Sequence, residues 1–395
     1  MRQTVCMFFD LYQPFHEYKD PGQILLGLKE IGVDAAMVTF KKGELTNYKS
    51  PFPLIQILPS SKGRELAGAI EPFDVAIIYS WLSPNYNFIV EIAKSLNKSV
   101  IIKSDSDGRF GATRHPKNRS IVLKVKSSPF SRASAGYIRR LIFPSIEKKQ
   151  ERKRIEQIAL SDAVVIESPD AAQNLSFLLF RNGRGDLIKK IHMIPNPVTP
   201  DFVNSEIRDK GNTVVSISRW EDKAQKNPEG LIMTLRNFLG FKENWNAIII
   251  GSGDNIIRTC MKNLPSSIQE RVSTTGILDH TKIKDYLLRS KIFFMPSRWE
   301  SFGIAAAEAL CCGLTLVGSP IESLRFLTMQ GFSGNVSYSW DPDALCGSLI
   351  FEANRWEKGE VDYINIAEFW RKKLNRQSIA RQYWKIIESL KVWGA

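Results

Sequence analysis

The chain has 395 residues, more than one compact core usually holds, so two domains are expected. Hydrophobic residues make up 43% and charged residues 24%, as in a soluble globular protein, and the net charge of +13 favours contact with an anionic partner. Five cysteines without a C-x-x-C pair argue against a disulfide framework or a zinc ribbon, and no apolar stretch approaches the roughly 20 residues that span a bilayer. These features predict a cytoplasmic protein, either free or peripheral on the inner face of the membrane.

The first half alternates short apolar runs with amphipathic stretches, the pattern of βαβ units and a parallel sheet. Helices are expected at Gln23–Ile31 and Asn87–Leu96. The expected strands are Thr4–Phe9, Asp34–Thr39, Val75–Tyr79, Ser99–Ile102 and Ala163–Ile166. Pro195, Pro197 and Pro200 cannot continue a helix or a central strand, so the stretch from Pro195 to about Gly211 is expected to link two domains.

The second half repeats this alternation. Strands are expected at Thr213–Ser218, Asn246–Ile250, Ile292–Met295 and Leu314–Gly318, and helices at Pro228–Leu239, Thr281–Ser290, Gly303–Cys312 and Ser378–Leu390. The sequence therefore predicts an α/β protein with two Rossmann-like domains, 1–200 and 201–377, and a C-terminal helix in 378–395. Because ligands of open α/β sheets bind beyond the carboxyl ends of the strands, the site is expected in a cleft between the domains.

The segment from Met295 to Leu310 carries the clearest chemistry. A strand ends at Met295 and a helix begins near Gly303, so the amides of residues 301–304 (Ser301, Phe302, Gly303 and Ile304) face outward at the positive end of the helix dipole. Such a helix start suits an anionic group, for instance a diphosphate. Glu300 before it and Glu308 along it supply carboxylates that accept hydrogen bonds from polyols on either side. A sugar nucleotide has this layout.

This block resembles the retaining GT-B glycosyltransferases of family 4 (glycosyl transferases group 1). Glu300 and Glu308 match the E-x7-E signature, and the run from Glu300 to Gly313 is similar to the family's E-G-F-G…E-A…G block. The resemblance implies that Glu308 binds the ribose, that Glu300 contacts the donor sugar as a catalytic residue, and that the Gly303 and Ile304 amides meet the phosphates. It also implies that no metal or other cofactor is required.

Arg219 and Lys226, between a strand end and the next helix, resemble the family's Arg and Lys that hold the donor diphosphate. An Arg fork and a Lys point charge can neutralise the departing diphosphate. Lys223 competes for the lysine role, and Lys226 is favoured because Asn227 and Pro228 follow it.

Weaker matches concern the loops around the donor. Gly276 and Ile277 fall where the family's backbone meets the nucleotide base. Gly22 stands where the family has a glycine-rich loop on the donor phosphates, although an ordinary turn before a helix explains it equally well. Pro195–Val198 resembles the family's hinge.

Asp105 and Asp107 follow the strand Ser99–Ile102. Oxygen ligands at this spacing could bind a hard cation, and Asp-x-Asp is the metal motif of the GT-A transferases. The resemblance favours the metal-free class instead, in which a histidine often stands at the position of Asp105. Asp105 is therefore the second catalytic candidate, with a loop cap as the alternative, and its role relative to Asp107 stays open.

Between Lys103 and Arg154, fifteen Lys or Arg residues stand against four Asp or Glu, with apolar residues interleaved. The segment 103–154 could contact an anionic membrane surface or a glycan or lipid-linked acceptor, which related transferases hold in the N-terminal domain. A solvated basic face is the alternative. Nucleic acid is not expected as a partner because no nucleic-acid motif is present.

The sequence thus predicts a retaining, metal-independent glycosyltransferase that uses a nucleotide-diphosphate sugar, in cell-surface polysaccharide or glycolipid synthesis. The alternatives are a sugar-nucleotide epimerase or a phosphorylase of the same fold, and a non-catalytic subunit that binds a polyanion. No cluster supplies an epimerase's base, and a phosphorylase would need a pyridoxal lysine and a longer chain.

Overall fold

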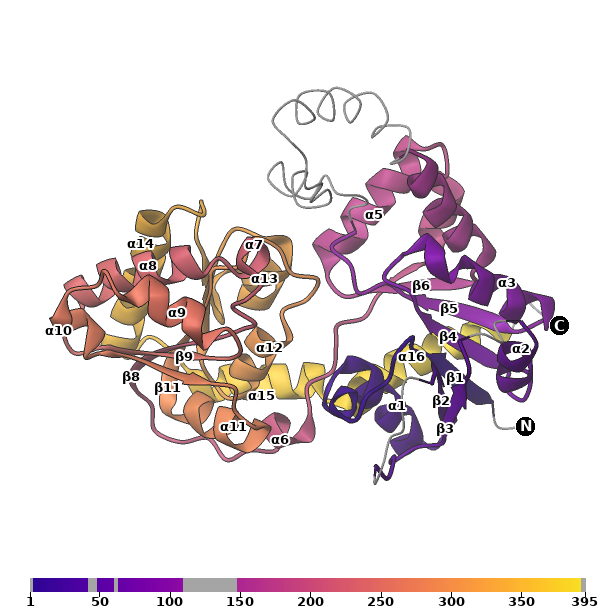
Figure 1. Cartoon of the computed structure of the whole chain (residues 1–395), viewed down its shortest axis with the longest axis horizontal. Coiled ribbons are helices and arrows are strands. Elements are labelled where there is room, and N and C mark those ends of the chain that lie inside the picture. The colour runs from indigo at the N-terminus through magenta and orange to yellow at the C-terminus, as the bar shows by residue number, and fades with distance from the viewer. Residues whose placement is uncertain (1–2, 42–47, 60–62, 109–147, 392–395) are drawn as a thin grey trace, which may run out of the picture.

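The structure, a computed structural model, describes residues 3–41, 48–59, 63–108 and 148–391. Two parallel sheets, each with helices packed on its faces, form two lobes (Figure 1). This arrangement confirms the GT-B fold class with two Rossmann-like domains. Within the described ranges, no helix combines the length and the apolar character that a bilayer crossing requires.

The N-terminal sheet has seven strands in the order β3-β2-β1-β4-β5-β6-β7. Their bounds are β1 Thr4–Phe8, β2 Asp34–Phe40, β3 Leu54–Ile57, β4 Val75–Tyr79, β5 Ser99–Lys103, β6 Ala163–Ile166 and β7 Ile191–Met193. The central strands are apolar at successive positions and buried on both faces, as parallel strands between helical layers are. The helices around them are α1 Asp20–Glu30, α2 Arg64–Ile70, α3 Asn87–Ser95, 148–160 and α5 Pro169–Arg181.

The C-terminal sheet has six strands in the order β10-β9-β8-β11-β12-β13. Their bounds are β8 Gly211–Ile217, β9 Asn246–Ile250, β10 Val272–Gly276, β11 Ser290–Met295, β12 Thr315–Gly318 and β13 Gly334–Val336. The main helices are α7 Lys223–Lys226, α8 Pro228–Phe241, α9 Asp254–Met261, α10 Ser266–Gln269, α11 His280–Arg289, α12 Ile304–Cys311, α13 Glu322–Thr328, α14 Pro342–Glu357 and α15 Tyr363–Leu374. One continuous hydrophobic core holds this domain together.

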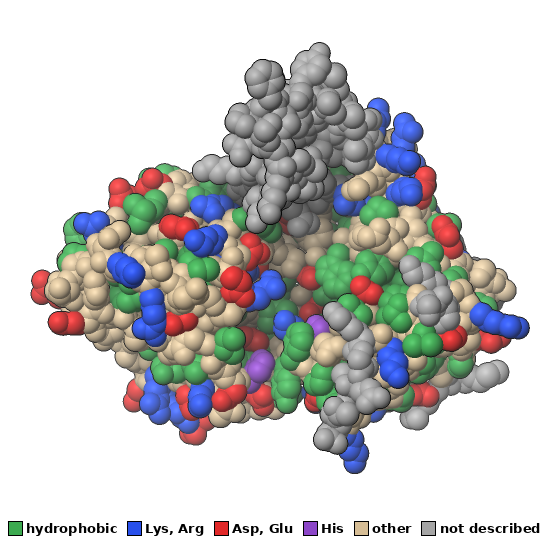
Figure 2. Space-filling model, in the orientation of Figure 1, with side chains coloured by type: hydrophobic (Ala, Val, Ile, Leu, Met, Phe, Trp, Pro, Cys, Tyr) green, Lys and Arg blue, Asp and Glu red, His purple; other side chains and the backbone are tan. Residues whose placement is uncertain are grey.

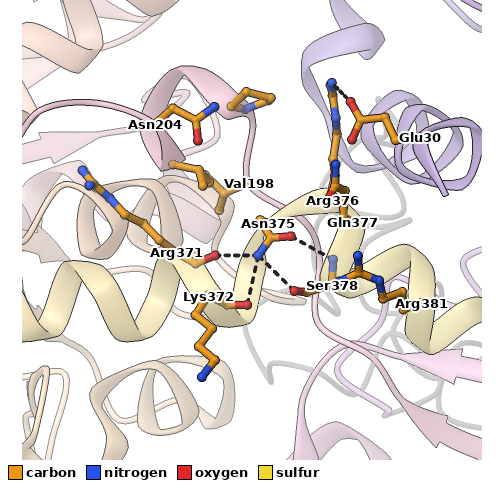
Figure 3. A pocket seen from close by; sticks show the side chains of 12 residues that line it. Glu30, Val198, Asn204, Arg371, Lys372, Asn375, Arg376, Gln377, Ser378 and Arg381 are labelled. Atoms are coloured by element: carbon orange, nitrogen blue, oxygen red, sulfur yellow. Dashed lines mark hydrogen bonds and ion pairs between the residues drawn. The ribbon is translucent and has the colours of Figure 1, made fainter.

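The chain crosses between the domains twice, and the two crossings lie side by side. The first contains the short helix α6 (Pro200–Val203), and the second joins α15 to α16 (Arg376–Lys391). The backbone N–H of Val198 donates to the Leu374 carbonyl at 2.9 Å, and Val198 forms a parallel bridge with Asn375. The Asn375 side chain donates to the Arg371 carbonyl and accepts from the Ser378 N–H, so it ends one helix and starts the next (Figure 3).

The last helix, α16, lies on the N-terminal domain (Figure 1). Ile379, Tyr383 and Ile387 are buried in the N-terminal core. Gly27 of α1 allows the close approach, because a Cβ there would lie 2.4 Å from the Arg376 carbonyl oxygen. A pocket of about 520 Å³ beside this junction has walls from both domains, including Glu30 and Asn204 (Figure 3).

Candidate active site

The loop after β8 carries Arg219 and leads into the one-turn helix α7. The Trp220 indole is buried and donates to the Ile250 carbonyl at 3.0 Å, which fixes the loop on the end of the sheet. The Asp222 carboxylate caps α7 by accepting from the Gln225 N–H. The loop therefore presents Lys226 in a fixed position at the carboxyl end of β8.

Lys226 and Glu300 form an ion pair of 2.6 Å between Nζ and Oε1. Only 10% of each side chain is exposed, and the Gln225 amide supports the pair by donating to the Trp299 carbonyl at 2.9 Å. Lys223, the competing lysine, is exposed and lies 3.9 Å from Glu229. The structure thus brings Lys226, rather than Lys223, next to Glu300.

Helix α12 starts at Gly303, which is its N-cap. Gly303 has φ +89°, a left-handed conformation that glycine adopts without a steric cost. Its carbonyl accepts from the N–H groups of Ala306 and Ala307, and the N–H groups of Ile304 and Ala305 have no partner within the helix. Phe302 is buried in the core below. Two backbone donors and the positive end of the helix dipole are therefore available to an anion.

Glu308 lies on the same helix, four residues after Ile304 and so on the same face. Only 8% of its surface is exposed, and its carboxylate makes no hydrogen bond with the described residues. Burial raises the pKa of Glu308 to about 8, while the charge of Lys19 acts in the opposite direction. A buried carboxylate with free acceptor positions is suited to the hydroxyls of a ligand.

The pKa of Glu308 predicts a pH effect on the stability of the unliganded protein. The folded value lies above the ordinary value, so the folded state binds more protons than the unfolded state between about pH 4.5 and 8. The free energy of unfolding should therefore fall as the pH rises through this window. Glu308→Gln should reduce this fall, as measured by urea unfolding at pH 5 and pH 8.5. An identical fall in both proteins would contradict the assigned burial.

The N-terminal domain reaches the same place through the residues before α1. The Tyr18 ring stacks on the His280 ring of the C-terminal domain, with centroids 4.9 Å apart. Removal from water lowers the pKa of Lys19, Arg219 lowers it further, and Glu308 raises it. Lys19 is therefore near enough to Arg219 and Glu308 to interact with them electrostatically, although the sequence did not single it out.

Gly22 lies in the first turn of α1, which begins at Asp20, three residues before the expected start. A Cβ on Gly22 would lie 2.6 Å from the Glu17 Cα and from the His16 carbonyl oxygen. Gly22 is thus packed against the preceding turn, and its donor contact stays a prediction without geometric support.

Asp105 follows β5 in a left-handed conformation with φ +39°. Its N–H donates to Oε1 of Glu167 at 2.8 Å, and the Ser106 N–H donates to Oε2 at 3.1 Å. The loop then packs on α5, where the Asn174 amide donates to the Asp107 carbonyl. Glu167 therefore fixes the backbone that presents Asp105.

A buried ionic network lies below this loop. Lys103 forms an ion pair with Glu167 and lies 3.9 Å from Asp20, whose carboxylate accepts from the Tyr79 hydroxyl. Burial alone would lower the pKa of Lys103, but Glu167 and Asp20 raise it above its usual value. Burial raises the pKa of Asp20 to about 6, with Lys103 opposing. Lys103 was counted in the basic segment, and its burial corrects that assignment: it is not available to an anionic surface.

The remaining predicted positions lie at the edge of the C-terminal sheet. Gly276 has φ +69° and accepts from the Gly251 N–H at 2.9 Å, and Ile277 is 78% exposed. Their contact with a base stays a prediction. Residues 109–147 of the basic segment lie outside the described residues. In the described part of the chain, no three His, Cys, Asp or Glu side chains are grouped as metal ligands, so Asp105 and Asp107 form no such cluster there.

The two parallel sheets and their connections define a protein of the GT-B fold. Residues 198–353 match the family model described as "Glycosyl transferases group 1", which covers Arg219, Lys226, Glu300 and Glu308. This part of the chain is therefore similar to the glycosyl transferases group 1.

Curated relatives match only part of this chain and only part of their own length. One of them is a component of the phosphatidylinositol N-acetylglucosaminyltransferase of Arabidopsis thaliana, to which the chain is 30% identical over 135 residues, covering 33% of this chain and 30% of the relative. The chain is also 25% identical over 218 residues to the amylovoran biosynthesis glycosyltransferase AmsK of Erwinia amylovora, covering 51% of each. The chain thus spans from about a third to about half of the length of these relatives.

A solved structure matches over nearly the whole chain. Anabaena HepE in complex with UDP aligns with a TM-score of 0.68 and 12% identity, covering 98% of this chain and 100% of HepE. At this identity the likeness establishes the fold alone.

Proposed function

We propose that this protein is a retaining, metal-independent glycosyltransferase that moves a sugar from a nucleoside-diphosphate sugar to a glycan or lipid-linked acceptor. The acceptor would belong to cell-surface polysaccharide or glycolipid synthesis. The observation that supports the proposal is the start of α12: two amides without a partner in the helix stand in the chain between Glu300, which pairs with Lys226, and the buried Glu308 carboxylate. The names of the relatives, a phosphatidylinositol N-acetylglucosaminyltransferase and an amylovoran biosynthesis glycosyltransferase, agree with it.

The chemistry follows from these groups. A departing nucleoside diphosphate gains negative charge, which Lys226, Arg219 and the α12 amides would stabilise without a metal ion. Glu308 would accept from the ribose hydroxyls and Glu300 from the donor sugar. Because Lys226 already neutralises Glu300, the carboxylate would not repel the diphosphate. Lys19, which interacts electrostatically with Arg219 and Glu308, would bring the N-terminal domain onto the donor and exclude water.

A panel of UDP-, GDP- and ADP-sugars tests the proposal through release of the nucleoside diphosphate. At least one sugar nucleotide should be turned over in the presence of EDTA, and the anomeric configuration of the product, read by NMR, should match that of the donor. Loss of turnover with EDTA would overturn metal independence, and the opposite anomer would overturn retention.

The same assay separates the other functions that the sequence left open. An epimerase would convert the sugar nucleotide without releasing the nucleoside diphosphate, and a non-catalytic polyanion-binding protein would give no turnover with any donor. Either result would replace the proposed activity.

A further inference from the structure

Aromatic rings follow one another along the carboxyl ends of β1 and β4. The Phe9 ring lies 5.5 Å from the Trp81 ring and 4.8 Å from His16, and Trp81 lies 4.7 Å from Tyr79 and 5.7 Å from Tyr86. Trp81 is 36% exposed, whereas Phe9 and Tyr79 are buried. Figure 2 shows hydrophobic side chains gathered on the N-terminal domain beside the hollow between the domains. A partly exposed indole that is held in place by neighbouring rings offers a rigid apolar surface to a ligand.

The backbone that presents this indole is strained. Trp81 and Leu82 have φ of +50° and +52°, two consecutive left-handed residues of which neither is glycine. Such strain persists only where the surrounding structure enforces it, and it gathers at ligand sites. Leu82 is buried in the core, so the turn that inserts Leu82 also directs Trp81 outward.

A buried glutamine enforces this turn. Gln157 accepts from the Ser80 hydroxyl at 3.0 Å and donates to the Ser83 carbonyl at 3.0 Å, so it holds the turn on both sides of Trp81 and Leu82. The Gln157 side chain is fully buried and also donates to Asn87. The exposed position of Trp81 is therefore fixed by the fold.

A carboxylate lies beside the aromatic surface. The Tyr86 hydroxyl donates to Oδ2 of Asp10 at 3.0 Å, and the other carboxylate oxygen makes no hydrogen bond with the described residues. A pyranose ring offers a face of C–H groups that stacks on an indole and a rim of hydroxyls that donate to a carboxylate. An acyl chain has nothing to offer the Asp10 oxygen, so the combination favours a sugar.

The aromatic surface belongs to the N-terminal domain, whereas the predicted donor-binding groups belong to the C-terminal domain. Tyr79 of β4 pairs with Lys103 of β5 in the sheet. Trp81 and Asp105 each follow this pair by two residues, so both lie just beyond the carboxyl ends of neighbouring strands. Burial raises the pKa of Tyr79 most, and the charge of Asp105 raises it further. Burial lowers the pKa of Lys19, whereas the charges of Glu308 and Asp105 raise it. Asp105 is thus near enough to Tyr79 and to Lys19 to affect both groups electrostatically.

We propose that Trp81 is the platform on which the acceptor's pyranose ring stacks, with Asp10 accepting from one of its hydroxyls. This proposal rests on the proposed function and names the acceptor group that the N-terminal domain recognises. Trp81 is thus a binding residue for a sugar, and the lipid or glycan attached to that sugar would extend away from it.

Saturation-transfer NMR tests the stacking proposal. The ligands are octyl β-D-glucopyranoside below its micelle concentration and the methyl pyranosides of glucose, galactose, mannose and N-acetylglucosamine. At least one glycoside should receive saturation at its ring C–H protons. Trp81→Ala should raise its dissociation constant by about ten-fold, and Trp81→Phe by less than about three-fold, because the aromatic face is kept. Phe241→Ala, which removes an exposed ring at the end of α8, should leave binding unchanged.

Binding of UDP or of another nucleoside diphosphate is followed on the same samples. Nucleotide binding shows that the variants are folded. It also distinguishes the two proposals, because a wild-type protein that binds no nucleotide would count against the proposed function. The stacking proposal is overturned if no glycoside binds while the nucleotide does, or if Trp81→Ala binds glycosides as the wild type does. Saturation confined to the octyl protons would also overturn it and indicate a lipid chain.

Discussion

Lys226→Ala is expected to lower kcat/KM for the donor by about 10²- to 10³-fold, the usual loss when one group that stabilises transition-state charge is removed. Lys226 is the only described cation that an ion pair fixes to Glu300. Its removal takes away a positive charge from the diphosphate and leaves the Glu300 carboxylate unneutralised beside it. The two effects act in the same direction, so the loss should appear mainly in kcat.

Lys223→Ala is the matched control, because this lysine lies on the same one-turn helix but is exposed and pairs only loosely with Glu229. It should retain kcat/KM within about three-fold, as surface charges contribute little. Lys226→Arg should restore little activity, since a planar guanidinium does not fit a site shaped for an ammonium. Equal losses in Lys223→Ala and Lys226→Ala would contradict the assignment of the donor lysine.

Glu167→Ala is expected to lower the free energy of unfolding by about 3–5 kcal/mol, the usual cost of leaving one member of a buried ion pair without its partner. Among the described residues, Lys103 would keep Asp20 at 3.9 Å as its remaining ion-pair partner, and the N–H groups of Asp105 and Ser106 would lose their acceptor. For a domain of this size, such a loss corresponds to a fall in melting temperature on the order of 10 °C. Differential scanning calorimetry measures it.

The control for this effect is Lys94→Ala, which breaks an ion pair with Asp162 that is about one third exposed on each side. It should cost less than about 1 kcal/mol. Glu167→Gln keeps an acceptor for the loop but removes the charge, so it should retain more activity than Glu167→Ala and be less stable than the wild type. Unchanged stability in Glu167→Ala would refute the network.

The sheets were predictable where strands are apolar on both faces. The strands Val75–Tyr79, Ser99–Lys103, Asn246–Ile250 and Ser290–Met295 each have a neighbouring strand on both sides, and their mostly buried residues form a continuous apolar run in the sequence. The edge strands β3, β7, β10 and β13 were not predicted. They are short and only partly buried, so their sequences carry little of this signal.

The C-terminal half of the site was more predictable than the N-terminal half. Arg219, Lys226, Glu300 and Glu308 stand in two continuous segments, each with a strand end and a helix start that fix the register. The sequence favoured Lys226 over Lys223 because Asn227 and Pro228 follow it, but it did not show what brings Lys226 to Glu300. The Lys226–Glu300 contact forms because the loop after β11 packs against α7. In this contact the Arg298 N–H donates to the Gln225 carbonyl at 2.7 Å.

Lys19, Glu167 and Trp81 were missed because their surroundings are assembled from distant segments. Glu167 directly follows the predicted strand Ala163–Ile166, so its position at a carboxyl strand end was the available signal. Lys103 looked like one of fifteen basic residues, but its buried partner lies 64 residues away. Two consecutive left-handed residues at Trp81 and Leu82 leave no signature in the sequence, since neither is glycine.

The most direct test is a crystal structure of the protein with a nucleoside diphosphate, beginning with UDP. We expect the ribose hydroxyls on Glu308, the diphosphate within hydrogen-bonding distance of the Ile304 N–H and Lys226, and Arg219 on the same phosphates. A nucleotide bound elsewhere, for instance through a metal ion on Asp105 and Asp107 with Glu308 still unpartnered, would contradict the account.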